Sequence, residues 1–206
     1  MEYRGKSYKP IVFSRLQFET RKNTATHMEV KGFCSFKADS IQPVLMQRLI
    51  EGMWKLGYLQ LLDIKIPLVD VKVEATVLFQ ETMLYKSLSP IVVPIQDGDR
   101  LRFCHPLESR FYDSVRQSAA NWYYLKWGEE IPSDTSIHIS LLHPEKFQLK
   151  KAAVLTKYKE KKLKGYQIPI KVQAPPKVQQ VLYESGAGSY SSQGFGCLQT
   201  LKEVKE

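Results

Sequence analysis

Two stretches of this sequence have residue types that bind phosphate groups, and both lie in the last third of the chain. The stretch 146–177 has ten lysines and a single acid, Glu160. The stretch 186–196 has four glycines and three serines in eleven residues. Lysine side chains neutralise phosphate charge, and glycines allow sharp turns in which backbone N–H groups can point at an anion. The two stretches therefore point to a polyanionic ligand.

The lysine-rich stretch holds the whole charge excess of the chain. The sequence has 30 Lys+Arg and 21 Asp+Glu, a formal net charge of +9, so outside this stretch 20 bases and 20 acids cancel. Such a block gives affinity for a phosphate backbone, with steep salt dependence and little sequence preference. The alternative is a solvated hairpin without a ligand, and we favour RNA because the block adjoins the glycine-rich stretch. The lysines predicted to contact RNA are Lys146, Lys150, Lys151, Lys157, Lys159, Lys161, Lys162 and Lys164.

The glycine-rich stretch has two interpretations. It is either a loop that presents N–H groups to phosphates or a helix stop and bend without a ligand. A dinucleotide site does not fit, because the first glycines follow a predicted helix and precede a predicted strand, and no Walker lysine follows. Tyr190 could stack on a base. The predicted binding residues are Gly186, Gly188, Ser189, Tyr190, Ser191, Ser192, Gln193, Gly194, Phe195 and Gly196.

Several classes of protein do not fit the composition. The first ten residues contain no apolar run, so a secretion signal is not expected. No window approaches the ~18 uncharged apolar residues of a membrane span. The three cysteines (Cys34, Cys104 and Cys197) are odd in number and far apart. This argues against a disulfide scaffold and a zinc site, and we expect a cytoplasmic protein without a metal or cofactor.

The first part of the chain predicts the order β-β-α-β. Residues 11–18 and 28–36 alternate as strands of a hairpin. A helix is predicted from an N-cap at Ser40 to a stop at Gly57, with apolar residues at helical spacing. Residues 59–78 are rich in β-formers.

The second part predicts β-α-β-β-α-β, the ferredoxin-like order. The expected elements are strands at 87–93 and 137–142, a helix at 107–127, a longer excursion through 148–158 and 164–172, a helix from Pro175-Pro176 to Gly186, and a strand at 194–201. The prediction is an α+β fold of tandem ferredoxin-like (RRM-like) modules, 1–85 and 86–206. The first module is expected to lack its opening strand and helix. Either the chain begins late, or the module is incomplete and another protein or a fused domain covers its sheet edge.

Several motifs resemble one known family. Gly186-x-Gly188-x5-Gly194-Phe195-Gly196 is similar to the C-terminal signature of the CRISPR-associated repeat-RNA endoribonucleases, the Cas six family. Tyr8-Lys9-Pro10-Ile11-Val12-Phe13-Ser14 and Leu88-Ser89-Pro90-Ile91-Val92-Val93 also resemble family motifs, as do the helix at 111–127 and Lys164-Gly165-Tyr166. The resemblance extends over nearly the whole chain in the same order.

The resemblance implies binding of CRISPR repeat RNA and one cleavage of precursor CRISPR RNA without a metal. A 2′-hydroxyl would attack the adjacent phosphate, leaving a 2′,3′-cyclic phosphate. This chemistry needs a general base, a general acid and a nearby cation. Lys9 occupies the place of the family lysine, and Tyr3 or Tyr8 would orient the 2′-hydroxyl.

The expected family histidine has no counterpart near Lys9. Tyr3 or its neighbours occupy the place where it would be expected, and the first histidine is His27. The four histidines (His27, His105, His138 and His143) are interpreted as surface or structural residues. Two functions stay open: a metal-independent ribonuclease, or a non-catalytic subunit that binds repeat RNA within a larger CRISPR complex.

Overall fold

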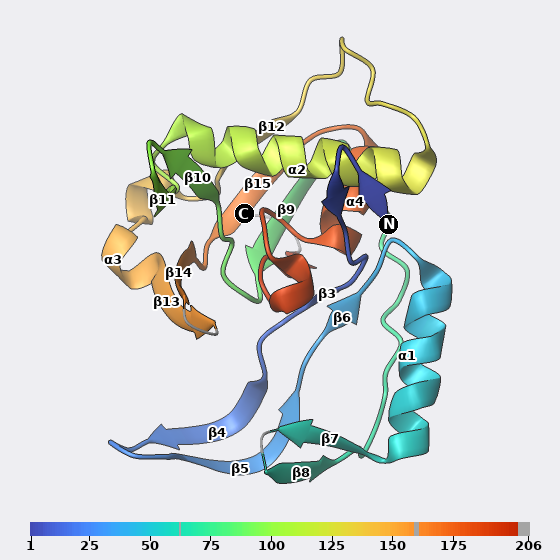
Figure 1. Cartoon of the computed structure of the whole chain (residues 1–206), viewed down its shortest axis with the longest axis vertical. Helices are drawn as coiled ribbons and strands as arrows, with labels where there is room; N and C mark the ends of the chain where they lie inside the picture. The colour runs from blue at the N-terminus through green and yellow to red at the C-terminus, as the bar shows by residue number, and fades with distance from the viewer. Residues whose placement is uncertain (62, 159–160, 202–206) are drawn as a thin grey trace, which may run out of the picture.

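The computed structural model describes residues 1–61, 63–158 and 161–201. In Figure 1 the sheet and the two longest helices of the second part lie above, and the strand pairs of residues 17–35 and 58–67 and α1 of the first part lie below, whereas the N-terminal strand pair of residues 2–7 lies above, at the level of the second part. The connection between the two parts, residues 68–81, contains no strand, although β-structure was expected as far as residue 78. The expected boundary between residues 85 and 86 falls inside strand β9, and the division of the chain into modules at that point stays a prediction.

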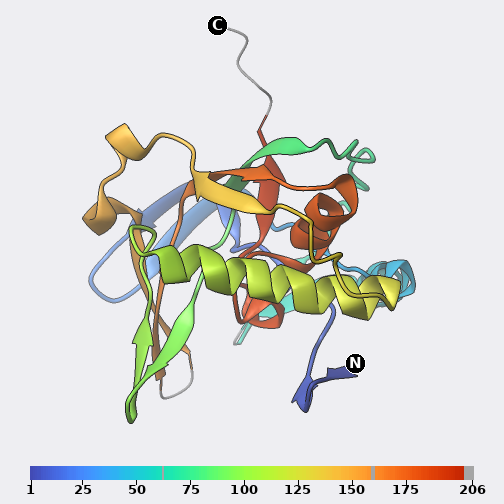
Figure 2. The same cartoon turned by 90° about the horizontal axis from the view of Figure 1, so that it is seen from above.

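One four-stranded antiparallel sheet organises the second part. Its order is β12-β15-β9-β16, and its strands are β9 (Thr82–Ser87), β12 (His138–Leu141), β15 (Pro169–Gln173) and β16 (Leu198–Thr200). Helices α2 (Ser109–Trp127) and α4 (Pro176–Ser185) pack against each other on the same face of this sheet (Figure 2). The β-α-β-β-α-β order predicted for this part is therefore confirmed.

The core lies between this sheet and the two helices. Alternate residues of the strands, such as Tyr85 and Val172, are completely buried, as strand periodicity requires. The residues of α2 predicted at helical spacing are buried as well: Phe111, Val115, Ala119, Trp122 and Tyr123. This face of α2 fixes the position of the helix, and its flank is free to hold the N-terminal segment.

Two hairpins and a helical turn are inserted into the second part. One hairpin consists of β10 (Pro94–Asp97) and β11 (Arg100–Phe103). After β12 come η1 (Pro144–Lys146), α3 (Leu149–Ala152) and the hairpin of β13 (Ala153–Tyr158) and β14 (Lys161–Tyr166). The strand predicted from 148 therefore begins five residues later, and residues 149–152 are helical.

Two other strand predictions in this part also need correction. The strand predicted at 87–93 lies at 82–87, and residues 88–93 make only isolated bridges, Ile91 to Tyr166 and Val92 to Ser189. The strand predicted at 194–201 is shortened to β16, which the 3-10 turn η2 (Ser191–Gln193) precedes.

The first part consists of strand pairs and one helix. Its elements are β1 (Glu2–Tyr3), β2 (Lys6–Ser7), β3 (Val12–Phe13), β4 (Gln17–Asn23), β5 (Met28–Ser35), β6 (Ala38–Asp39), α1 (Pro43–Leu56), β7 (Tyr58–Leu61) and β8 (Ile64–Pro67). The hairpin predicted from strands at 11–18 and 28–36 is confirmed only in its second strand. Its first strand, β4, lies at 17–23, and residues 12–13 form β3, which pairs with β6. The helix stop is confirmed at Gly57, whose φ is 70°. The predicted N-cap is wrong. Gln42 precedes α1, and the Ser40 hydroxyl donates to the Pro10 carbonyl thirty residues away.

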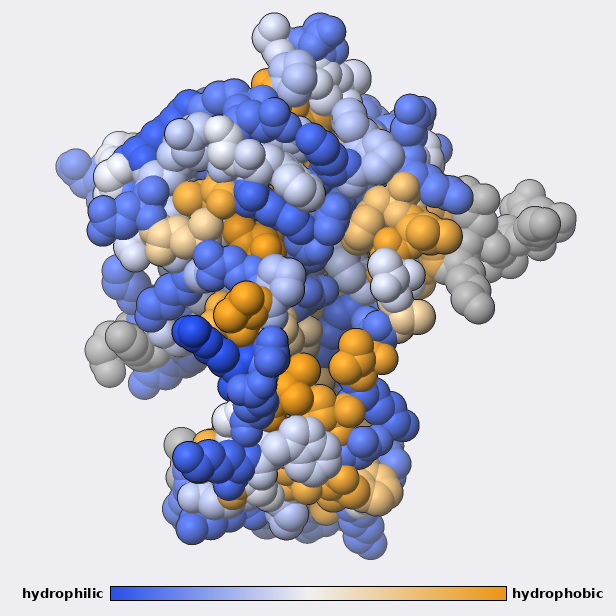
Figure 3. Space-filling model, turned by 90° about the vertical axis from the view of Figure 1, so that its right-hand side faces the viewer, coloured by the Kyte–Doolittle hydropathy of each residue, from blue (hydrophilic) through white to orange (hydrophobic). Residues whose placement is uncertain are grey.

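The first part leaves apolar side chains exposed. No residue of α1 is buried, and Val44, Trp54 and Leu56 are at least half exposed. Figure 3 shows hydrophobic side chains on the lower part of the face where α1 lies (Figure 3). That another protein or a fused domain covers the first part stays a prediction. Among the described residues, no helix is long and apolar enough to span a membrane.

Candidate nucleic-acid interface

The glycine-rich loop, residues 186–196, is packed into the protein rather than raised above it. Gly196 has a φ of 71°, and a Cβ at this position would lie 2.1 Å from the Ala187 carbonyl oxygen. At Gly188, a Cβ would lie 2.7 Å from the carbonyl oxygen of Val92. Both positions therefore require glycine because another stretch of backbone passes too close for a side chain.

Several N–H groups of the loop are bonded within the protein. Ala187 N–H donates to Gly196 O at 2.8 Å, and Ser189 N–H donates to Val92 O at 2.8 Å. Gly196 N–H donates to Pro90 O at 2.9 Å. The expectation that the loop presents bare N–H groups is therefore wrong for these three donors. Contacts with a ligand would come from the half-buried residues at 189 and 190 and at 192–194.

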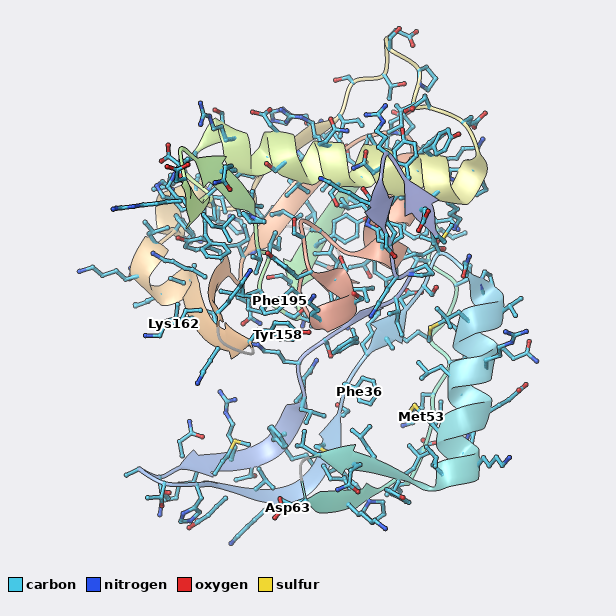
Figure 4. All side chains as sticks on the ribbon, viewed as in Figure 1. Phe36, Met53, Asp63, Tyr158, Lys162 and Phe195 are labelled. Atoms are coloured by element: carbon cyan, nitrogen blue, oxygen red, sulfur yellow. The ribbon has the colours of Figure 1, made fainter. Side chains whose placement is uncertain are left out.

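Tyr190 belongs to a small apolar cluster beneath the loop. Its φ is 66°, an uncommon value for a residue with a side chain. Its ring makes an edge contact with Phe195 at 6.4 Å, and both pack with Val92 and Leu163. Phe195 lies close to Tyr158 of β13 in Figure 4, and Tyr158 packs on the same cluster (Figure 4). The cluster joins the loop to the hairpin that carries the lysines.

The lysine hairpin, strands β13 and β14, has one apolar and one cationic face. Leu163 is buried against the cluster, and the alternate residues of β14, Lys162 and Lys164, are exposed. The register pairs Lys157 with Lys162 and Leu155 with Lys164, so the three lysines share one face. Lys162 points away from the body of the protein in Figure 4. Lys161 is also exposed, and Lys159 lies outside the described residues.

The cationic face concentrates three positive charges. Among the residues that the structure describes, no acidic side chain forms an ion pair with Lys157, Lys162 or Lys164. Like charges directly opposite each other in a strand pair are destabilising. An anion bound along this face would remove the repulsion. Lys146, Lys150 and Lys151 are exposed in η1 and α3, which lead into the hairpin.

The segment 8–15 links the loop to the lysine hairpin. A Cβ at Gly194 would meet the ring of Phe13 at 2.8 Å, so the loop lies directly against β3. Further along, the guanidinium of Arg15 donates to Thr156 Oγ1 at 2.6 Å. Burial, and then the nearby Arg21, lowers the pKa of Arg15. Arginine keeps its charge in proteins, so Arg15 adds a cation beside β13. Arg15 could not be recognised from the sequence, because the contact joins residues 141 positions apart.

Tyr8 packs on α2 close to the point where the glycine-rich loop meets this helix. The side-chain amide of Asn121 donates to the Tyr8 hydroxyl oxygen at 3.1 Å, and the Tyr8 ring meets Trp122 edge-on at 5.0 Å. One turn earlier on α2, the Ser118 hydroxyl donates to Gly188 O at 2.8 Å. The N-terminal segment and the loop therefore lie side by side on α2. Lys9 is exposed.

Tyr3 lies further along α2 and is engaged elsewhere. Its hydroxyl donates to Glu130 at 2.6 Å, and its ring stacks on Tyr124 at 4.5 Å. The hydrogen bond to the Glu130 carboxylate, followed by burial, raises the pKa of Tyr3. Tyr8 is therefore better placed than Tyr3 to act beside the loop.

The histidines lie on separate elements. His27 is hydrogen-bonded to Thr24 and Thr26 in the β4–β5 turn, and His105 lies 3.4 Å from Glu108 before α2. His138 is in β12, and His143 lies 3.5 Å from Glu145. Each of these contacts joins residues close in sequence. The arrangement agrees with the interpretation of the histidines as surface or structural residues, and their roles stay a prediction.

Comparisons with known proteins agree with this fold. The family model of the C-terminal part of the CRISPR-associated protein Cas6 matches residues 71–200, more than half of the chain. The chain is 23% identical over 181 residues to the CRISPR-associated endoribonuclease Cas6 of Pyrococcus furiosus. That alignment covers 85% of this chain and 65% of the relative, so the chain spans less than two thirds of the relative's length.

Two solved structures are similar over nearly the whole chain. One, from a Cas6-related gene of Pyrococcus furiosus, has a TM-score of 0.81 at 20% identity and covers 94% of this chain and 79% of its own. The other, described as an RAMP protein binding different RNA substrates, has a TM-score of 0.79 at 20% identity, covering 93% and 79%. With the antiparallel sheet described above, these likenesses confirm the α+β, tandem ferredoxin-like fold class.

Proposed function

The chain belongs to the Cas6 family of CRISPR-associated proteins, and from this premise we propose that it binds CRISPR repeat RNA and processes the precursor RNA. The observation that carries the proposal is the packing of segment 8–15 and the glycine-rich loop against the apolar face of the lysine hairpin. The other face of the hairpin carries Lys157, Lys162 and Lys164, and Lys9 and Arg15 add cations on segment 8–15. Phosphate contacts with these cations would supply the affinity.

Cleavage would occur where segment 8–15 meets the loop. The 2′-oxygen of one ribose attacks the adjacent phosphorus, a base takes the 2′-hydroxyl proton, and the bond from phosphorus to the 5′-oxygen breaks. The leaving 5′-oxygen takes a proton, and the products carry a 2′,3′-cyclic phosphate and a 5′-hydroxyl. Lys9 stabilises the negative charge that develops on the phosphate. Tyr8 accepts a hydrogen bond from Asn121, so its own proton can be donated to the RNA.

The second candidate function is repeat-RNA binding without cleavage. It is favoured by one observation: the tyrosine nearest the expected histidine position, Tyr3, is bonded to Glu130, and its pKa is raised, which makes it a poor base. In this case the chain would hold RNA for another protein of a CRISPR complex.

One assay separates the two functions. The chain is incubated with its own repeat RNA in EDTA, and the products are analysed for a single cut that ends in a cyclic phosphate. Processing predicts this product at a rate that follows enzyme concentration. Tight binding without any cut would exclude cleavage by this chain and leave the binding function.

A further inference from the structure

A pocket lies at the base of the lysine hairpin. Its volume is about 390 Å³, within the range of small-molecule sites. It is built by the end of β12, the η1–α3 connection and the short link between β14 and β15. Ala152 immediately precedes the hairpin and Gln167 immediately follows it, and Gln167 N–H donates to Ala152 O at 2.9 Å. The pocket therefore continues the surface of the hairpin at the end opposite its tip.

The lining combines apolar and cationic groups. The apolar side includes Phe147, Ile168 and Pro169, and Phe147 packs against the main core. Lys146 and Lys151 also line the pocket, and both are exposed. The nearby acid Glu145 lies 3.5 Å from His143. Within the described part of the chain, neither Lys146 nor Lys151 is ion-paired with an acid.

This combination suits a nucleotide. The faces of a base are apolar and pack on aromatic and aliphatic side chains, while its phosphates need cations. The lysines of the hairpin face, Lys157, Lys162 and Lys164, are followed by Lys151 and Lys146 at the base. In Figure 1, α3 leads directly into β13 at the base of the hairpin, so a strand of RNA bound along the hairpin from tip to base would approach the pocket.

We propose that this pocket receives the base of one unpaired nucleotide of the bound RNA, with Lys146 and Lys151 on the adjacent phosphates. The proposal rests on the proposed binding of repeat RNA. It identifies the place on the protein where one base of that RNA is held. Elsewhere on the hairpin the contacts are to phosphates and are insensitive to sequence.

The test is a scan of the RNA against matched lysine variants. The probes are fluorescent repeat RNAs, fully 2′-fluorinated to prevent cleavage, each with one abasic nucleotide. The full chain is used as wild type, Lys151→Ala and Lys150→Ala. Lys150 and Lys151 are neighbours in α3, both exposed, and only Lys151 lines the pocket.

The proposal predicts that one abasic position, or two adjacent ones, weakens wild-type binding about tenfold, as expected for loss of a stacked base. In Lys151→Ala, an abasic nucleotide at the same position weakens RNA binding only about twofold or less, because the nucleotide is no longer held. In Lys150→Ala the tenfold loss persists, although binding of all the RNAs weakens together.

Four results would overturn the proposal, and they are distinguishable. If all RNAs bind the wild type equally, or if the positional loss is unchanged in Lys151→Ala, the pocket holds no base while RNA binding stands. If no RNA binds, the proposed function fails as well. The last result is that adenosine or uridine 5′-monophosphate alone binds at micromolar concentration, that this binding is lost in Lys151→Ala, and that no abasic position weakens RNA binding. The pocket would then be a site for a free nucleotide.

Discussion

Lys157 and Lys162 lie directly opposite each other in the lysine hairpin, and both are exposed. Their repulsion is a cost to the free protein that a bound phosphate backbone would remove. We predict that the double substitution Lys157→Gln and Lys162→Gln weakens RNA binding and lowers the slope of log affinity against log salt by about 0.7–0.9 for each lost phosphate contact. Thermal unfolding of the free variant should occur at the same or a higher temperature.

The control is Lys72→Gln, which removes an exposed lysine that lies 3.8 Å from Asp70 in the connection between the two parts of the chain. Binding titrations at several salt concentrations compare the variants. An unchanged salt slope in the double variant would place the RNA elsewhere.

Gly196→Ala should destabilise the protein. The new Cβ would meet the Ala187 carbonyl oxygen at 2.1 Å, in addition to the strain of a φ of 71°. Gly98 is the matched control, because its φ is 59° and nothing lies within 4 Å of a Cβ there. Urea unfolding should give a loss of about 1 kcal/mol for Gly98→Ala and a clearly larger loss for Gly196→Ala. Equal losses would mean that the loop can move away from its neighbours.

Much of the fold was predictable from the sequence because its signals are local. The strand at 28–35 and the helix at 109–127 are encoded by alternation, helical spacing and a terminal glycine. The segment 68–81 was not predictable in the same way. It has β-forming residues, but a strand also needs a partner, and alternation says nothing about a partner far away in the chain.

The residue types of the site could be predicted from the sequence, but the contacts between its residues could not. The lysines and the glycine-rich loop are recognisable from residue type, but the contact of Arg15 with Thr156 joins distant positions. The same holds for Ser40, which is a good N-cap residue in isolation and instead bonds to the Pro10 carbonyl. Long-range contacts of this kind decide which local preference is realised.

Asp39 should make stability depend on pH. Burial raises the pKa of Asp39 from 3.8 to about 6. The hydrogen bond from Ser40 N–H lowers this pKa, and the nearby Glu184 carboxylate raises it. The folded state therefore binds the Asp39 proton more tightly than the unfolded state does. The resulting contribution to folding stability is complete below about pH 4 and is lost as the pH rises through 6. Asp39→Asn keeps the acceptor oxygen and removes the charge.

We predict that Asp39→Asn matches the wild type near pH 4 and is more stable by up to about 3 kcal/mol at pH 8. Chemical unfolding at both pH values measures the difference. A variant less stable than the wild type at pH 8 would show that the charge of Asp39 stabilises the fold, through Lys37 for example.

Substitutions in the N-terminal segment distinguish the roles of Lys9, Tyr8 and Tyr3 in cleavage. Lys9→Ala should slow cleavage about 10²-fold or more through lost charge stabilisation, with a smaller effect on binding. Tyr8→Phe should also slow cleavage, whereas Tyr3→Phe should not, because the Tyr3 hydroxyl is bonded to Glu130. Single-turnover kinetics at saturating enzyme measure the cleavage step. Loss of cleavage in Tyr3→Phe with full activity in Tyr8→Phe would reverse the assignment.

The most direct test of the central claim is a map of protein–RNA contacts. Repeat RNA is crosslinked to the full chain by ultraviolet light, and the crosslinked peptides are identified by mass spectrometry. We predict crosslinks in residues 8–15, in the lysine hairpin and η1–α3 at 146–166, and in the glycine-rich loop at 186–196. Crosslinks confined to α1 and the β7–β8 hairpin would contradict the claim that this surface holds the RNA.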